Sequence, residues 1–186
     1  MSLIAPDPFE TARLRVRRVT RGDLPALLHV NSDDGVTQFL PYATWQNLDD
    51  AEAWMQRVEK SQASGTAWQF VVADKGSDQA IGTCLIFRHD EGSARAELGY
   101  VLGRARWGGG YMFEALRALL DQAFTVMALR RIEAEVDPNN VASLALLERL
   151  GFTREGRARE RWMNRGTPID VVTFGLLKRE WCGAAT

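Results

Sequence analysis

Three consecutive glycines at positions 108–110 stand between a segment with strand-like alternation and an apolar segment with helical spacing. Because glycine has no Cβ, the backbone N–H groups of such a turn can approach a ligand closely. The first N–H groups of a helix also lack intrahelical partners and carry the positive end of the helix dipole. The turn therefore predicts an anion site, most simply for phosphate, to which Arg104 and Arg106 would add positive charge. A flexible connector without a ligand is the alternative.

Two common phosphate-binding loops do not fit this turn. A nucleotide-binding P-loop closes with Lys and then Ser or Thr, whereas Tyr111 and Met112 follow the last glycine here. A dinucleotide-binding turn ends its Gly-x-Gly-x-x-Gly pattern on a small residue, and counting from Gly108 that position holds Phe113. The turn therefore favours a different kind of phosphate-bearing ligand.

A second stretch with chemical potential lies at residues 131–152. Its first apolar residues alternate as in a strand, and the Asp-Pro-Asn-Asn sequence that follows is typical of a turn. The next segment has leucines at helical spacing and ends at Gly151, which suits the left-handed end of a helix. Asn140 could cap this helix, and the same side chain could contact a ligand.

Together, and in this order, the two stretches resemble GNAT-type N-acetyltransferases. The glycine turn resembles the acetyl-coenzyme A loop of that family, written Arg/Gln-x-x-Gly-x-Gly/Ala. The second stretch resembles the family's Asn-x-x-Ser helix that ends in Gly-Phe, here Asn140, Ser143 and Gly151 with Phe152. Residues 11–17 and 166–181 resemble the RimJ/RimL-like branch, which includes ribosomal-protein N-terminal acetyltransferases, so the resemblance covers nearly the whole chain.

The resemblance implies an α/β (α+β) fold, in which a mixed, mostly antiparallel twisted sheet of about seven strands is flanked by about four helices. It also implies a V-shaped splay between the central strands, which leaves backbone groups unpaired for the cofactor. One N-acetyltransferase domain would span residues 1–186.

The resemblance also assigns residues to acetyl-coenzyme A, the expected co-substrate. Backbone N–H groups of the turn and of the helix start would bind the pyrophosphate: Gly108, Gly109, Gly110, Tyr111 and Met112. The end of the preceding strand would pair with the pantetheine amides and polarise the thioester carbonyl: Tyr100, Val101 and Leu102. Asn140 and Ser143 would lie near the thioester. Trp107 stands where Arg or Gln is commonest, and Met112 replaces a small residue, so the family pattern is not fully kept.

Two side chains could carry out the transfer to a primary amine, which must be neutral to attack. Glu97 would be the general base; a surface carboxylate paired with Arg95 or Arg104 is the alternative. Ser143 would protonate the departing thiolate, because Leu147 stands where many relatives carry an acidic Tyr. A helix serine that bonds only to backbone is the alternative there. No covalent enzyme intermediate is required.

The sequence leaves the acceptor open. The branch resemblance favours the α-amine of a peptide or protein, and a polyamine, an amino acid or an aminoglycoside is the small-molecule alternative. A non-catalytic acyl-coenzyme A-binding regulatory protein and a structural protein with an empty loop are the rivals from other classes. Aromatic residues in an irregular segment would form either core or an acceptor wall: Phe39, Tyr42 and Trp45. Three acidic residues could add negative charge near the acceptor, and solvated loop charges are the alternative for them: Asp33, Asp34 and Glu91.

Composition sets broad limits. The chain has 186 residues, of which 46% are hydrophobic and 25% charged, and this suits one globular core. Its net charge of −1 gives no general attraction to nucleic acid or membranes. Two cysteines, Cys84 and Cys182, and two histidines, His29 and His89, predict neither a disulfide framework nor a metal site. With no secretory signal and no long apolar run, we expect a cytoplasmic monomer or homodimer.

The functional residues need strands and helices that place them. The apolar patterns predict strands at residues 14–19, 68–73, 81–88, 94–102, 132–136, 153–160 and 169–177. Helices are expected after a cap at Asp23, from Asp49 or Asp50, after the glycine turn and around Ser143. Residues 31–47 are predicted to be irregular.

Overall fold

The structure is a computed structural model that describes residues 5–181. Within these residues lie eight strands: β1 (Phe9–Glu10), β2 (Leu14–Arg18), β3 (Trp68–Asp74), β4 (Ala80–Asp90), β5 (Arg95–Leu102), β6 (Arg131–Val136), β7 (Thr153–Asn164) and β8 (Thr167–Leu177). The same residues form five α-helices: α1 (Leu24–Asn31), α2 (Asp34–Thr37), α3 (Leu48–Ala63), α4 (Tyr111–Thr125) and α5 (Val141–Arg149).

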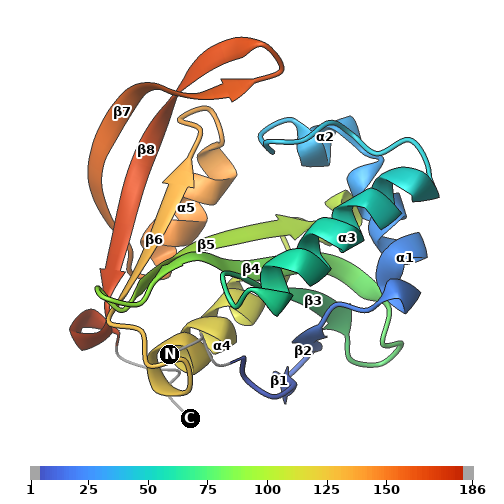
Figure 1. The fold of residues 1–186 in the computed structure, drawn as a ribbon, viewed down its shortest axis with the longest axis horizontal. Coiled ribbons are helices and arrows are strands. Elements are labelled where there is room, and N and C mark those ends of the chain that lie inside the picture. Colours follow the sequence, from blue (N-terminus) through green and yellow to red (C-terminus); the bar gives the residue numbers. More distant parts are fainter. Residues whose placement is uncertain (1–4, 182–186) are drawn as a thin grey trace.

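The eight strands form one mixed sheet in the order β1-β2-β3-β4-β5-β6-β8-β7 (Figure 1). Neighbouring strands are antiparallel, with the exception of β5 and β6, which run parallel. A parallel pair needs a crossover connection, and α4 lies in the chain between these two strands. The predicted α+β fold with a mostly antiparallel sheet is confirmed.

The two parallel strands separate soon after they begin. They pair at Arg95 with Arg131, at Ala96 with Ile132 and at Glu97 with Glu133. Beyond Glu97, β5 continues to Leu102 with β4 as its partner on the other side. The predicted splay between the central strands is therefore present, and it begins at Glu97.

Helices cover both faces of the sheet, as Figure 1 shows. Strand β3 illustrates the division, because successive side chains of a strand point to opposite faces. Phe70 and Val72 belong to the core that includes the apolar face of α4. Val71 and Ala73 belong to a second core with residues of α1 and α3.

The same alternation places the polar side chains of the central strands. Ala96 and Leu98 of β5 and Ala134 of β6 lie in the core beside α4. Glu97 and Glu135 therefore point to the opposite face of the sheet. Burying a carboxylate costs free energy unless it has hydrogen-bonding or charged partners. The sheet face that carries these two glutamates is therefore expected to have polar side chains around them instead of a second apolar layer.

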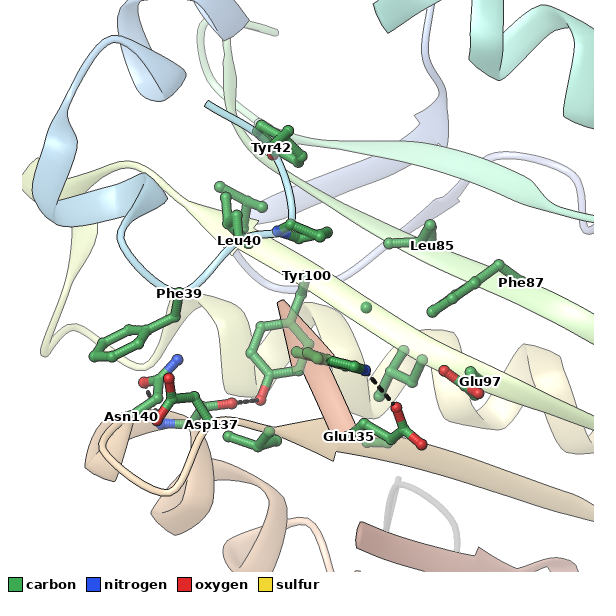
Figure 2. A pocket seen from close by; sticks show the side chains of 18 of the residues that line it. Phe39, Leu40, Tyr42, Leu85, Phe87, Glu97, Tyr100, Glu135, Asp137 and Asn140 are labelled. Carbon is green, nitrogen blue, oxygen red and sulfur yellow. Dashed lines mark hydrogen bonds between the residues drawn. The ribbon is translucent and has the colours of Figure 1, made fainter. Parts of the chain in front are cut away.

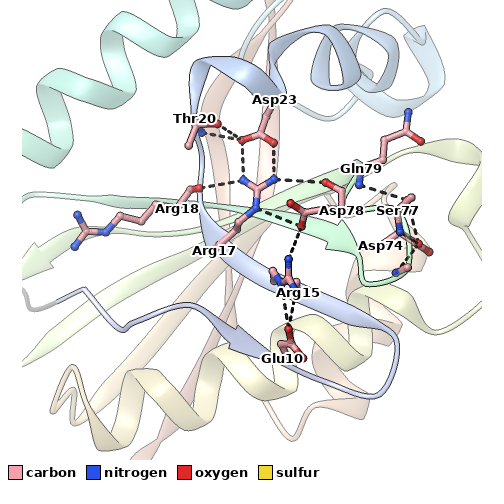
Figure 3. Close-up of polar contacts among 11 residues, drawn as sticks. Glu10, Arg15, Arg17, Arg18, Thr20, Asp23, Asp74, Ser77, Asp78 and Gln79 are labelled. Atoms are coloured by element: carbon pink, nitrogen blue, oxygen red, sulfur yellow. Dashed lines mark hydrogen bonds and ion pairs between the residues drawn. The ribbon is translucent and has the colours of Figure 1, made fainter.

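A buried ion pair fixes the connection from β2 to α1 (Figure 3). Arg17 donates to both carboxylate oxygens of Asp23 at 2.8 and 2.9 Å, and the Thr20 backbone N–H donates at 2.8 Å. Burial acts to raise the pKa of Asp23, but these hydrogen bonds outweigh it and hold the pKa below its ordinary value. Asp23 is the N-cap residue of α1, as predicted, but its side chain makes no hydrogen bond to that helix, because its carboxylate accepts from Arg17 and Thr20 instead.

Several predicted boundaries need correction. The described residues form eight strands and five α-helices instead of about seven and four, because β1 and the one-turn helix α2 were missed. Helix α3 starts one or two residues early, since Asn47 caps it through its side chain. Strands β7 and β8 continue beyond the predicted limits to form a long hairpin.

No helix in residues 5–181 is long and apolar enough to cross a lipid bilayer. The same residues contain no group of three or more His, Cys, Asp or Glu side chains placed to hold a metal ion. Cys84 is buried, which raises the pKa of its thiol. Cys182 lies outside the described residues.

Candidate active site

A cavity of about 550 Å³ opens on the polar face of the sheet, where β5 separates from β6. Strands β4, β5 and β6 form its floor, residues 39–42 form one wall, and residues 161–164 of β7 form another. Figure 2 shows Glu97, Tyr100 and Glu135 along the separating strands, with Phe39 and Tyr42 on the other side of the space. The cavity thus brings together segments that lie far apart in the sequence.

Glu97 is buried on the cavity floor at the last paired position of β5. Its carboxylate accepts hydrogen bonds from Nη1 of Arg88 at 2.8 and 3.0 Å. Burial is the largest influence and raises the pKa of Glu97 above its ordinary value; Arg88 opposes it, and Glu135 and Glu133 add to it. A carboxylate with a raised pKa is better matched to general base work near neutral pH. The alternative partners Arg95 and Arg104 pair elsewhere.

Arg88 has an unusual backbone for an arginine. Its φ of 50° lies in the left-handed region, which costs free energy for a residue with a Cβ. The β4–β5 register shifts between Phe87 and Asp90, directly around this residue. The irregular part of β4 is thus the part that carries the guanidinium bonded to Glu97.

Glu135 is a second carboxylate on the same floor, and sequence reasoning missed it. It accepts a hydrogen bond from the Trp162 indole N–H at 2.9 Å. Nη1 of Arg88 lies 3.8 Å and Nε of Arg161 3.5 Å from its oxygens. The alternation of β6 could have placed Glu135 opposite the apolar core, but its partners on β4 and β7 come only from the tertiary fold.

A hydrogen bond crosses the splay between the Tyr100 hydroxyl of β5 and the Ser143 hydroxyl of α5. The two oxygens lie 2.5 Å apart (Figure 2). Burial raises the pKa of Tyr100 to about 12, although the bond to Ser143 opposes this, so the phenol keeps its proton at neutral pH. Sequence reasoning assigned only the backbone of Tyr100 to a function. Counting the alternation on from Ala96 and Leu98 would have pointed its side chain toward α5.

The start of α5 has the predicted geometry. Asn140 is its N-cap, and the Asn140 side-chain oxygen accepts from the Ser143 backbone N–H at 3.2 Å. Both residues line the cavity. Leu147, one turn further on, is completely buried, so the position at which many relatives carry a tyrosine contributes to the core here. Gly151 has φ of 89°, as the predicted helix end requires.

The glycine turn follows the C-terminal end of β5 and leads into α4. Gly108 and Gly110 have φ of 73° and 74°, a conformation that residues with a Cβ rarely adopt. Gly110 is the N-cap of α4 and provides no side-chain cap, whereas α2, α3 and α5 each have one. Within residues 5–181, the start of α4 thus has no side-chain cap for its first N–H groups, which fits a bound phosphate group.

The arginines at this turn differ from the prediction. Asp33 accepts two bonds from Arg104, both at 2.6 Å, so Arg104 adds little free charge to the turn. Arg106 lies 3.9 Å from Asp74 and near the Tyr111 ring. Arg13 of the N-terminal segment instead donates to the Gly109 carbonyl at 2.9 Å. The Nε of Arg13 also pairs with Glu114 at 2.7 Å, so its charge, like that of Arg104, is partly balanced by a carboxylate.

Trp107 folds back onto the strand that precedes the turn. Its indole N–H donates to the Leu102 carbonyl at 2.8 Å, and the residue is 49% exposed. The Leu102 carbonyl therefore already has a donor, while Val101 lines the cavity. Edge-on pairing with pantetheine amides is thus better suited to the strand before Leu102. Tyr111 and Met112 occupy the first turn of α4, where backbone N–H groups have no intrahelical acceptor.

The aromatic residues of the 31–47 segment divide between core and cavity. Trp45 is buried in the core with α1 and α3, whereas Phe39 and Tyr42 line the cavity. The acidic residues suggested for the acceptor do not line it; the cavity carboxylates are those of Glu97, Glu135 and Asp137.

The β7–β8 turn reaches across to the segment that follows α2. Asn164 donates to the Gln38 carbonyl at 2.9 Å, and Arg165 donates to the Thr44 hydroxyl at 3.2 Å. These exposed bonds join two walls of the cavity at its rim.

Comparison with known proteins agrees with this geometry. Residues 13–153 match the family model described as acetyltransferase (GNAT) domain. The chain is 38% identical over 173 residues to an uncharacterized N-acetyltransferase of Bacillus licheniformis, covering 93% of this chain and 97% of the relative. It is 32% identical to the [ribosomal protein uS5]-alanine N-acetyltransferase of Escherichia coli, covering 70% of this chain and 68% of the relative. The ribosomal-protein-S5-alanine acetyltransferase of Vibrio fischeri superimposes with a TM-score of 0.81 at 25% identity, covering 94% of this chain and 98% of that one.

Proposed function

The chain belongs to the GNAT family of N-acetyltransferases, and we propose from this premise that it moves an acetyl group from acetyl-coenzyme A to the α-amine of a peptide or protein. The observation that carries the proposal is the buried Glu97 carboxylate in an open cavity at the point where β5 leaves β6. An α-amine with a pKa near 8 is partly neutral at pH 7, so a carboxylate base suffices for it. The Escherichia coli relative, named for an alanine of a ribosomal protein, supports this acceptor class.

The residues present fit acetyl-coenzyme A as the co-substrate. When bound, it supplies the acetyl group as an activated thioester. The uncapped start of α4, with Gly108 and Gly110, would hold the pyrophosphate. The β6-facing edge of β5 beyond Glu97 would hold the pantetheine amides through unpaired backbone groups. These two features lie at the two ends of one continuous segment, which suits a long ligand.

Glu97 and the Tyr100–Ser143 pair would then divide the proton transfers between them. Glu97 accepts the proton that the attacking amine loses. Ser143 donates its hydroxyl proton to the sulfur of the departing thiolate, and Tyr100 donates in turn to Ser143. The phenol therefore takes the place of the tyrosine that relatives carry on the helix, but reaches the site from β5.

Removing either hydroxyl should slow turnover without weakening cofactor binding. We expect Ser143→Ala and Tyr100→Phe each to lower kcat by about 10- to 100-fold, and the double variant to lose little more, because the two hydroxyls act as a unit. Steady-state kinetics and a calorimetric Kd for acetyl-coenzyme A measure this. Tyr42→Phe is the matched control, since the Tyr42 hydroxyl donates to Asn31 instead. An unchanged kcat in Tyr100→Phe would remove the phenol from the reaction.

Acceptor profiling tests the proposed function itself. Peptides with a free α-amine should be acetylated with a kcat/KM on the order of 100-fold above that of N-blocked peptides with a free lysine, whose amine is far more often protonated at pH 7. The panel also includes spermidine, free amino acids and an aminoglycoside, and coenzyme A release and mass spectrometry are the readouts. Acetylation confined to the small molecules would contradict the proposal.

A further inference from the structure

The cavity holds a connected chain of four charged side chains, from its mouth to its floor. Arg161 lies 3.5 Å from Glu135, Glu135 lies 3.8 Å from Arg88, and Arg88 bonds to Glu97 at 2.8 Å. The remaining charged group that lines the cavity, Asp137, accepts from the backbone and side chain of Asn139 in its own turn. The charges of these four side chains thus alternate in sign and sum to zero.

The negative and the positive side chains of this set lie at different depths in the cavity. The side chains of Glu97 and Glu135 are 10% and 13% exposed, whereas those of Arg88 and Arg161 are 53% and 54% exposed. The carboxylates therefore meet a ligand group that enters deeply, and the guanidinium groups meet what remains nearer to solvent. A ligand that is positive at its inner end and negative further out matches this arrangement.

The guanidinium groups keep donors available for such a ligand. Among the described residues, Arg161 contacts Glu135 through Nε, and Arg88 contacts both carboxylates through Nη1. A guanidinium has five N–H donors in a planar fork that suits a carboxylate. The remaining N–H donors of these two arginines can therefore bind an anionic group at the cavity mouth.

An incoming amine also changes the charge balance of the site. An ammonium group that pairs with Glu97 competes with Arg88 for the same oxygens. Arg88 then needs another negative partner, and an unpaired charge in a half-buried site is unfavourable. An acidic group carried by the acceptor would supply that partner, while a second positive group would meet two guanidinium groups and be repelled.

We propose that the preferred acceptor is a peptide α-amine followed within its first few residues by Asp or Glu, whose carboxylate binds Arg88 and Arg161. The inference rests on the proposed function, because it specifies the peptide acceptor of the same site. Arg161 is the specificity-determining residue, since it reads the acidic side chain without contacting Glu97. Basic N-terminal peptides and polyamines are disfavoured by the same two arginines.

Matched peptides with a common N-terminal alanine test the proposal. They carry Asp, Asn or Lys at position two or at position three and are otherwise identical and neutral. For the purified full chain at low salt, we expect kcat/KM for the best Asp peptide to exceed that of its Asn counterpart about 5-fold, and the Lys peptide to fall about 5-fold below Asn, the upper range for half-exposed ion pairs. Higher salt should reduce both ratios.

Variants of Arg161 separate specificity from folding. Arg161→Gln should bring the Asp-to-Asn ratio close to one, and Arg161→Glu should invert the preference toward Lys. Arg159→Gln is the matched control, because Arg159 lies two residues earlier on β7 and does not line the cavity; it should keep the wild-type ratios. Equal kcat/KM for all peptides, or ratios unchanged in Arg161→Glu, would overturn the inference while leaving the proposed function intact. Acetylation of small amines but of no peptide would overturn both.

Discussion

Replacing Glu97 by Gln is expected to lower kcat by about 100- to 10,000-fold, the range for loss of a positioned general base. The amide keeps the shape of the side chain and a hydrogen-bonding oxygen, but it cannot accept a proton from the amine. Initial rates with a saturating peptide acceptor and acetyl-coenzyme A measure the effect. A kcat within a few fold of wild type would exclude Glu97 as the base.

The pH dependence gives the same test a second readout. Glu97 works only when it is deprotonated, and burial raises its pKa above the ordinary value. Wild-type activity should therefore fall as the pH drops through this raised pKa, and the acidic limb should be absent from the residual activity of Glu97→Gln. Glu133→Gln is the control, because Glu133 is paired in register with Glu97 but binds Arg95 and Arg131. It should keep most of the rate and the limb, with the limb moved to slightly lower pH because Glu133 contributes to the raised pKa of Glu97.

Replacing Gly110 by Asp is expected to weaken acetyl-coenzyme A binding about 100-fold, whereas Gly110→Asn should stay within about 5-fold of wild type. Asp and Asn have the same shape, and both tolerate the left-handed φ of 74° better than other residues. A Cβ at this position would meet Arg13 at an ordinary contact distance of 3.7 Å, so both variants should fold. The difference between them is the charge placed against the pyrophosphate.

Calorimetric titration of the two variants, with melting temperatures as the folding check, measures this difference. Equal weakening by Asp and Asn would assign the loss to the backbone instead of the charge. Wild-type affinity in both would remove the glycine turn from the cofactor site. Either result would be visible without an acceptor, so this test is independent of the acceptor question.

The parts of the site that sequence patterns predicted are those set by local structure. Asn140 and Gly151 mark the start and the end of α5 as expected, because capping and left-handed helix ends depend on neighbouring residues. The splay between the central strands followed from the family resemblance, which did not place it at Glu97. The glycine turn was located from its own residues, although the guanidinium that contacts it proved to be that of Arg13 instead of Arg104.

The parts that were missed depend on contacts between distant segments. Arg88 reaches Glu97 through an irregularity in β4 that no periodic pattern reveals. Glu135 and Arg161 meet only because β6 and the far end of β7 lie on the same cavity. Tyr100 is an intermediate case, since strand alternation could have given the direction of its side chain but not the helix residue that it meets.

The short seam between β5 and β6 also bears on how the chain assembles. The pairs β1–β2, β3–β4, β4–β5 and β7–β8 close short loops, whereas β2–β3, β5–β6 and β6–β8 are joined by longer connections. Of these three long-range pairings the seam has the fewest residue pairs, three against five for β2–β3 and six for β6–β8, so it returns the least interaction for the loop that it closes across α4. We therefore expect the seam to be among the last contacts made during folding and among the first lost during unfolding.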